Sequence, residues 1–292
     1  MKSLTLFLAT GLLVGAIAEL EAGHTKSVQS KTTLSQVDCT LTPIPFSAMH
    51  HRQSAAPRLK LSQSTSGNWS GYGVPLEGSG DSDTFSQVSG TWNVPSVTGT
   101  GRSTTYSSCW VGIDGYSSAS VEQIGTEQDW SSGKQKNYAW FEMYPAGGYQ
   151  ITGFTVNPGD SISAQVVYLG QTTVQTGVGR HKGTALQDVF QLTIINNTRK
   201  QSYTVPTSYT TTSTMDRSSA EWIVEAPSSG KILPLANFSP VNFSECYATG
   251  LIRSGAISDW AYDPLTMVDP SGGEAAPSAL SDDGTAFSVT HE

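Results

Sequence analysis

The nine residues that indicate the fold of this chain are Ser219-Ala220-Glu221-Trp222-Ile223-Val224-Glu225-Ala226-Pro227. β-Branched and aromatic residues occupy the middle of the stretch and a proline ends it, which is typical of a strand. Strand alternation places Glu225 on the same face as Ile223, and Trp222 on the opposite face. A carboxyl group among apolar neighbours keeps its proton more readily, so Glu225 is a candidate general acid or base. The alternative is a carboxylate exposed to solvent at a strand end.

Short alternating runs of this kind continue to the end of the chain, and helical periodicity is nearly absent. Glycine, serine and threonine are frequent between the runs. This pattern predicts an all-β domain built as an antiparallel sandwich or barrel. The expected strands are 68–75, 85–94, 105–113, 120–126, 136–144, 161–168, 189–196, 202–205, 220–225, 242–249 and 285–290.

The first 61 residues differ from the rest of the 292-residue chain. Lys2 precedes an apolar run and then Ala16-Ile17-Ala18, the pattern of a secretory signal peptide. The next segment is rich in serine, threonine and glutamine and has a basic balance. We therefore expect a signal peptide at 1–18, a pro-segment at about 19–61 and a folded body at 62–292, secreted to the extracellular space.

The charge of the chain is divided unevenly between these segments. The body has 10 Lys and Arg residues against 21 Asp and Glu residues, whereas the segment 19–61 has five cations and three carboxylates. A basic leader and an acidic body suggest a pro-segment held partly by charge and released at low pH. A disordered linker without an inhibitory role is the alternative. The acidic surface argues against a nucleic-acid partner, and no stretch of the body is apolar enough to predict a membrane span.

One stretch has an aromatic face. Alternation over 138–145 places Tyr138, Trp140, Glu142 and Tyr144 on one side of a strand, opposite an apolar row. Aromatic walls with a few polar groups are typical of a binding cleft. A strand buried on both faces is the alternative, because aromatic residues also fill sandwich cores.

The cysteines do not indicate a catalytic or metal site. Cys109 precedes a tryptophan, as papain-like nucleophiles do, but a thiol nucleophile needs a histidine base and the body has only His181 and His291. Alternation also places Cys109 in an apolar row, so we interpret it as structural. Cys109 and Cys246 are able to form one disulfide in an oxidising compartment, which the sequence alone does not establish. No metal and no cofactor are expected.

Several peptidase chemistries are excluded by missing motifs. The chain has no Gly-x-Ser-x-Gly elbow, no His-Glu-x-x-His helix and no Asp-Thr-Gly or Asp-Ser-Gly. Carboxylate chemistry with amide partners on a β-scaffold is what remains. Gln123 is the candidate amide, although pairing with backbone at a strand edge is the usual role of a glutamine.

Several ordered motifs resemble those of the glutamic peptidases, the eqolisins. They are Asn-Trp-Ser-Gly at 68–71, Trp-Val-Gly-Ile-Asp-Gly at 110–115, Gln-x-Gly at 123–125, Trp-Phe-Glu-Met-Tyr-Pro at 140–145, Ala-Glu-Trp-Ile-Val-Glu at 220–225 and a segment at 238–243. Their order and spacing make the resemblance more specific than any single motif. Met143 departs from the family pattern, which often has a second tryptophan there.

The resemblance implies an antiparallel β-sandwich of two packed sheets, of the concanavalin A-like type, made as a zymogen and active in acid as an endopeptidase. The family's catalytic glutamate and glutamine match Glu225 and Gln123. The residues that match the family's cleft lining are Trp69, Trp110, Asp114, Trp140, Glu142 and Tyr144. The expected partners are polypeptide substrates and the chain's own pro-segment as an intramolecular inhibitor, and the expected state is a monomer.

Peptide hydrolysis by such a pair needs an activated water and a donor for the oxyanion. Ionised Glu225 would take a proton from water and hand it to the leaving amine, while the Gln123 amide would donate to the oxyanion. Two other functions stay open from the residues. A lectin-like sandwich would use the seven tryptophans, all of which follow Leu61, to stack on sugars, and a glycosidase would use two carboxylates but give Gln123 no role.

Overall fold

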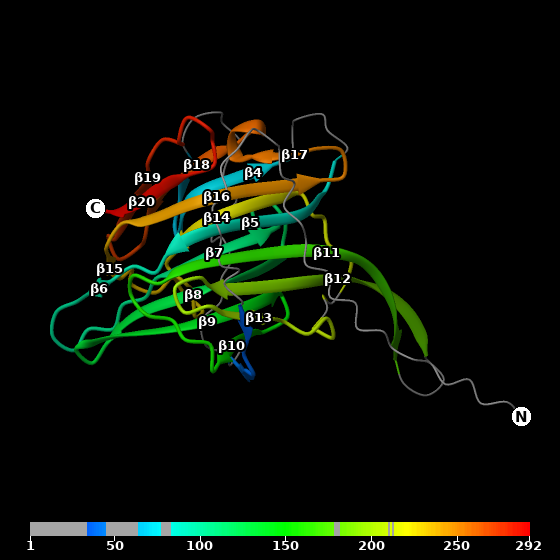
Figure 1. The fold of residues 1–292 in the computed structure, drawn as a ribbon, viewed down its shortest axis with the longest axis horizontal. Helices are drawn as coiled ribbons and strands as arrows, with labels where there is room; N and C mark the ends of the chain where they lie inside the picture. The colour runs from blue at the N-terminus through cyan, green and yellow to red at the C-terminus, as the bar shows by residue number, and fades with distance from the viewer. Residues whose placement is uncertain (1–33, 45–63, 77–82, 178–181, 210, 212) are drawn as a thin grey trace, which may run out of the picture. The chain divides into compact units, whose positions relative to one another are not determined.

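The protein folds almost entirely as β-strands (Figure 1). The computed structural model describes residues 34–44, 64–76, 83–177, 182–209, 211 and 213–292. All of them belong to the unit Thr33–Glu292. The only helix within this described part is the 3-10 helix η2, Ile257–Asp259, and no helix in it is long and apolar enough to cross a membrane.

The strands in chain order are β1 Ser35–Gln36, β2 Thr40–Pro43, β3 Ser64–Ser66, β4 Trp69–Pro75, β5 Phe85–Asn93, β6 Val97–Thr98, β7 Ser108–Ile113, β8 Val121–Ser131, β9 Lys134–Tyr144, β10 Gly148–Thr152, β11 Ser161–Thr176, β12 Gly183–Asn196, β13 Gln201–Thr204, β14 Ser219–Glu225, β15 Asn237–Phe238, β16 Val241–Gly250, β17 Ser254–Ala256, β18 Asp263–Val268, β19 Glu274–Pro277 and β20 Phe287–His291.

Their pairings form two layers. The first layer runs β2-β10-β9-β8-β7-β14-β4-β18-β3, and the second runs β1-β13-β12-β11-β5-β16, with β17 and β20 also paired to β16. β19 pairs with both β18 and β20 and so joins the layers at one side, while β6 and β15 form a separate small sheet. Only the β1–β13 and β3–β18 pairs are parallel among these. The predicted antiparallel β-sandwich of two packed sheets is confirmed.

Strand β14 lies in the middle of the first layer. It is hydrogen-bonded along its length to β4 on one side and to β7 on the other, and all seven of its residues are buried. Trp222 faces the second layer, where its indole Nε1 donates to the carbonyl oxygen of Ser89 at 2.7 Å. Ile223 belongs to a different apolar cluster on the opposite face, so the predicted alternation is correct.

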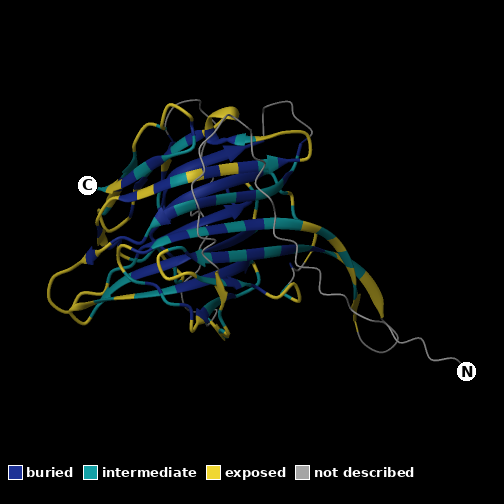
Figure 2. Cartoon of the chain, in the orientation of Figure 1, coloured by how far each residue is buried: buried dark blue, intermediate teal, exposed yellow. Residues whose placement is uncertain are grey.

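A large apolar core fills the space between the layers. It includes Val111 and Phe141 from the first layer and Val166 and Leu192 from the second. Figure 2 shows the central strands of both layers mostly as buried, with the exposed residues concentrated in loops and in the projecting ends of β11 and β12. These projecting ends were not expected from the sequence, which predicted strands that end near residue 168 and begin near residue 189.

Two strands come from the segment that we expected to be a leader. β1 pairs with β13 and β2 pairs with β10, so residues 34–44 are part of the sheets. The predicted signal peptide at 1–18 lies outside the described residues. The predicted pro-segment at 19–61 is described only at residues 34–44. The sequence analysis did not predict these strands, because they are only two and four residues long and show no sustained alternation.

Candidate active site

The outward face of the first layer carries its own apolar cluster. Alternate residues of neighbouring strands build it, and their order along each strand keeps them on one side of the sheet. The cluster consists of Trp69, Trp110, Tyr116, Val121, Trp140, Ile223 and Leu265, with Ile44, Tyr138 and Tyr144 packed against it. Four residues of the predicted cleft lining, three tryptophans and Tyr144, therefore lie together on this face.

Glu225 ends strand β14 on the same face. It stands between Trp69 of β4 and Ser108 of β7 in the pairing register. Its Oε1 accepts a hydrogen bond from Asn68 Nδ2 at 2.9 Å, and its Oε2 accepts one from Trp110 Nε1 at 2.8 Å. Both oxygens of the carboxyl group are thus oriented by fixed donors.

Burial dominates the electrostatics of Glu225, whose side chain is 0% exposed. Burial raises the pKa of Glu225 well above its ordinary value, and the hydrogen bond from Trp110 opposes this rise. The nearby Glu142 carboxylate also raises the pKa. Burial therefore favours the protonated form of Glu225 more than in a carboxyl group exposed to water.

Gln123 and Glu142 lie opposite each other on strands β8 and β9. The Gln123 amide Nε2 donates a hydrogen bond to Glu142 Oε2 at 3.2 Å, and both side chains are 0% exposed. Because Glu142 acts electrostatically on Glu225, these three groups form one polar set within the aromatic face. Gln123 and Glu142 are thus directly hydrogen-bonded, and Glu225 lies on the same face of the layer, on β14, which β7 separates from β8.

Two glycines make room for Trp110. A Cβ added at Gly125 would lie 2.5 Å from the Trp110 Cβ, and one added at Gly112 would lie 2.9 Å from Trp110 Cζ3. Trp110 is therefore able to reach Glu225 only because the neighbouring positions on this face lack side chains. Trp69 packs against Trp110 edge to face, with ring centroids 4.9 Å apart, and fixes its orientation further.

Trp140 is also held by a polar contact. Its Nε1 donates to the Ser108 hydroxyl at 3.0 Å, and that hydroxyl donates to the carbonyl oxygen of Thr126 at 3.2 Å. Asn68 and Ser108 are the orienting residues that sequence reasoning did not single out. The Asn-Trp motif at 68–69 was a sequence signal for Asn68, whereas no sequence pattern indicated Ser108.

Asp114 lies apart from this polar set. Its carboxylate accepts hydrogen bonds from the backbone N–H groups of Arg217 and Ser218, each at 2.8 Å, and from the Ser218 hydroxyl at 3.0 Å. Burial raises its pKa and these hydrogen bonds lower it. The side chain predicted to line the cleft thus anchors the loop that leads into β14.

A second pair of carboxyl groups lies on the same face of β8, and the sequence analysis missed it. Glu127 pairs across the strands with Ser108, the residue that also stands opposite Glu225. Burial raises the pKa of Glu127 well above its ordinary value and that of Asp129 to about 6, while a hydrogen bond between the two groups favours the proton on Glu127. Alternation along β8 from Gln123 was the available signal for this pair.

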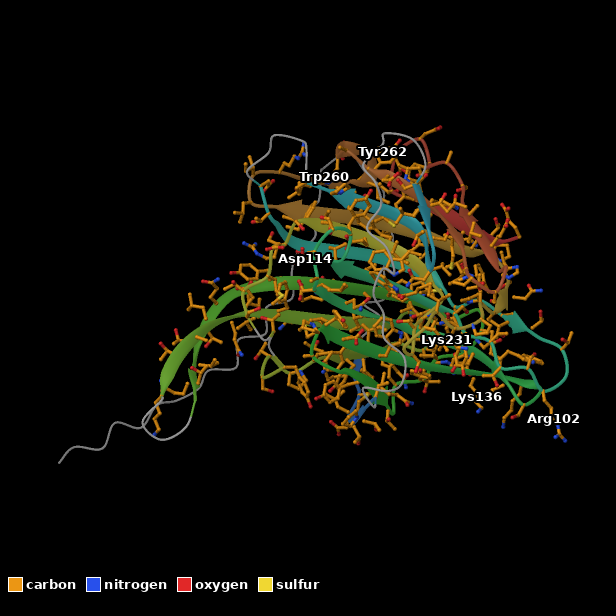
Figure 3. All side chains as sticks on the ribbon, turned by 180° about the vertical axis from the view of Figure 1, so that it is seen from behind. Arg102, Asp114, Lys136, Lys231, Trp260 and Tyr262 are labelled. Carbon is orange, nitrogen blue, oxygen red and sulfur yellow. The ribbon has the colours of Figure 1, made fainter. Side chains whose placement is uncertain are left out.

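Three cations of the body lie away from Asp114 (Figure 3). Figure 3 shows Lys136 at the same end of the molecule as Arg102 and Lys231, with Asp114 toward the other end. Lys136 is the cation that lowers the pKa of Asp129.

The cysteines are structural in this fold. Cys39, Cys109 and Cys246 are all free thiols, so the disulfide between Cys109 and Cys246 that the sequence left open is not formed. Cys109 is fully buried and its Sγ donates to Gln128 Oε1 at 3.4 Å. Across the described ranges, no group of three or more His, Cys, Asp or Glu side chains is placed to hold a metal ion.

The face combines the Glu225 carboxyl group, whose two oxygens are both oriented, with the Gln123 amide donor and the Glu142 carboxyl group. Aromatic side chains line the same face. A carboxyl group of this kind exchanges protons with a bound molecule, and an amide N–H donor stabilises a developing oxyanion. Hydrolysis of a carbonyl compound by activated water is the reaction that such a set is equipped to perform.

Comparison with known proteins relates this chain to named peptidases. The model of the Peptidase A4 family matches residues 67–270. The chain is 30% identical to aspergillopepsin-2 of Aspergillus niger over 215 residues, which are 65% of this chain and 68% of that protein. It is 32% identical to scytalidopepsin B of Scytalidium lignicola over 183 residues, which are 60% of this chain and 63% of the relative.

A solved structure extends the similarity to the fold. The crystal structure of scytalido-glutamic peptidase with a transition state analog inhibitor superimposes with a TM-score of 0.59 at 25% sequence identity. The superposition covers 77% of this chain and 98% of that one. A second crystal structure, of scytalido-glutamic peptidase with a peptide based transition state analog, agrees with a TM-score of 0.59 at 26% identity.

Proposed function

Since this chain belongs to the peptidase A4 family, the glutamic peptidases, we propose that it is an endopeptidase that cleaves polypeptides in acid with Glu225 and Gln123. Membership of the family gives the enzyme class, a glutamic-type hydrolase of peptide bonds. The observation that supports the residue assignment is the pair of fixed donors on Glu225, from Asn68 and Trp110, on the same face of the layer as the Gln123–Glu142 hydrogen bond.

In the proposed mechanism Glu225 acts first as a base and then as an acid. It takes a proton from the attacking water as the water adds to the scissile carbonyl, and it returns that proton to the leaving amine. The Gln123 amide donates to the oxyanion of the tetrahedral intermediate. Glu142 holds the Gln123 amide in place, and the tryptophans wall the peptide from bulk water.

The base must be ionised, whereas burial raises the pKa of Glu225 and so favours its protonated form. Opening of the face to water removes the desolvation that raises the pKa, so the carboxylate forms within the acidic range where a glutamate ordinarily titrates. We propose that the enzyme is therefore inactive as long as the site is closed.

The closed site supports the zymogen hypothesis. Ile44 packs against the aromatic face, and its backbone N–H donates to the Gly148 carbonyl at 2.9 Å. We propose that the chain is secreted through a signal peptide at 1–18, and that its leader inhibits the body until it is cut in acid. The active form is proposed to be a monomer.

The direct test of this function is cleavage of an unfolded protein substrate between about pH 2 and pH 7. We expect cleavage in acid that pepstatin, an inhibitor of aspartic peptidases, does not reduce. Complete inhibition by pepstatin, or the absence of cleavage after the leader has been removed, would reject the proposal. A sugar-binding sandwich would then be tested by glycan binding.

Replacing Gln123 with alanine will lower kcat by about a hundredfold to a thousandfold, because the oxyanion loses its donor. The matched control is Gln128→Ala on the same strand. Gln128 is equally buried, but its amide bonds to Thr126 Oγ1 and not to the polar set. A Gln123→Ala enzyme within fivefold of the wild type, with equal thermal stability, would remove Gln123 from the mechanism.

A further inference from the structure

Residues 34–44 lie in the gap left by two sheet edges. Thr40–Pro43 pairs with the outer edge of β10 over four residues, which makes β2 the last strand on that side of the first layer. Ser35–Gln36 pairs with β13 of the second layer, and the N–H groups of Ser35 and Val37 donate to carbonyl oxygens of that strand region at 2.9 and 3.0 Å. One short segment thus completes both layers (Figure 1).

Apolar side chains hold this segment, and charge does not. Val37, Cys39 and Leu41 pack against the main core, and Ile44 packs against the aromatic face. Leu41 stands opposite Ile151 in the register of β2 and β10. The segment has one charged residue, Asp38, and none of the leader's five cations. Protonation of the body's carboxylates in acid therefore leaves its contacts unchanged.

The expected charge-based release consequently does not apply to this part of the leader. Removal of the segment would uncover the backbone edges of β10 and β13 together with the apolar surface beneath them. Open sheet edges are sites of aggregation, which folded proteins cover or shorten. Residues 34–44 therefore serve as the edge strands that cover β10 and β13 of the body.

We propose that residues 34–44, Ile44 included, stay bound as permanent edge strands after the leader is cut. The inference rests on the proposed function in assuming a cut between Ile44 and Ser64. The mature enzyme would then consist of the body and a small, non-covalently held N-terminal chain. The predicted pro-segment boundary at about residue 61 would then not mark the start of the folded protein, because strands lie on both sides of it.

The first experiment measures retention without relying on the protein's own activity. Residues 52–58 are replaced by the recognition sequence of a site-specific protease, the full-length protein is cut there, and the product is passed through gel filtration at pH 4. Denaturing mass spectrometry of the body peak should show the N-terminal fragment in one-to-one amount. A body peak without the fragment overturns the proposal.

A matched pair of variants distinguishes strand docking from accidental retention. Leu41→Asp buries a charge against the core and should release the fragment, whereas Thr40→Asp lies at an exposed position of the same strand and should retain it. Equal retention in both variants would show that the β2 contacts do not hold the fragment, which also overturns the proposal.

The second experiment asks whether the segment has to leave for activity. Thr40 and Thr152 are exposed and stand directly opposite each other in the register of β2 and β10. Thr40→Cys with Thr152→Cys, in a Cys39→Ser background, therefore places the two thiols for a disulfide that locks β2 to β10. After the cut, the locked enzyme should have the same kcat with and without a phosphine reductant, which acts in acid. Activity that appears only on reduction would show that the strand must depart.

The two experiments separate this inference from the proposed function. If the fragment is retained but neither the locked nor the reduced protein cleaves a substrate, the peptidase proposal fails and the edge-strand proposal stands. If the protein cleaves but the fragment is lost, the reverse holds.

Discussion

Replacement of Glu225 by glutamine will lower kcat by at least about a thousandfold while the protein stays folded. General acid–base catalysis by one group contributes up to about ten-thousandfold, and here the same group is proposed to act twice. The amide can neither take the proton of water nor return one to the leaving amine. The measurement is kcat on an unfolded protein substrate near pH 3, with circular dichroism and thermal unfolding as checks of the fold.

Glu221→Gln provides the matched control for that variant. Glu221 lies on the same strand and the same face as Glu225 and is also fully buried, but it is no part of the proposed dyad. We expect its kcat to remain within a few-fold of the wild type. Residual activity of Glu225→Gln above a few per cent would eliminate Glu225 as the base, whatever the control shows.

The second large effect is on stability: the free energy of unfolding will fall by several kcal/mol between pH 4 and pH 8. Burial raises the pKa values of six carboxyl groups, Asp114, Glu122, Glu127, Asp129, Glu221 and Glu225. The native state keeps these protons at pH values where the unfolded chain has released them. Their stabilising contribution is complete below the ordinary carboxyl pKa and is lost as pH rises through the raised values.

Each unit by which a pKa is raised corresponds to about 1.4 kcal/mol of this loss per group. Small domains are stable by only about 5–15 kcal/mol, so we expect unfolding in mild alkali. On the acid side, hydrogen bonds lower the pKa values of Asp160 and Asp269, and the stability that these two contribute is lost as pH falls through those values. Stability should therefore be greatest at moderately acidic pH.

Urea unfolding at a series of pH values measures the effect. Glu122→Gln is the informative variant, because both Glu122 oxygens are buried without a hydrogen-bond partner among the described residues and burial is the main cause of the raised pKa. This variant should reduce the decline in the free energy of unfolding above pH 5. Asp160→Asn should leave that decline unchanged and act only on the acid side. A flat stability profile from pH 4 to pH 8 would contradict the prediction.

The sequence predicted the fold class well because alternation is a local signal. The run around Trp222 fixes the faces of β14 from neighbouring residues alone, and the structure has Trp222 in the main core with Ile223 on the other face. The positions of Gln123, Glu142 and Trp140 on one face followed from the same rule together with the family motifs.

Features that depend on distant partners could not be predicted in this way. Asp114 sits within a motif, yet its carboxylate is bound to the loop at Arg217 and Ser218, which no local pattern indicates. The strand nature of residues 34–44 depends on two edges, β10 and β13, that form only when the sandwich is assembled. Ser108 orients Trp140 through a contact across two strands of the sheet.

The central position of β14 in the sheet has a consequence for how the protein unfolds. Amide protons of a strand bonded on both sides and fully buried exchange with deuterium only when the whole domain opens, whereas edge strands exchange through local fluctuations. Glu225 is attached to that slowest-exchanging strand. Loss of the carboxyl geometry on warming should thus coincide with global melting, without an earlier stage in which a folded enzyme has a disordered catalytic centre.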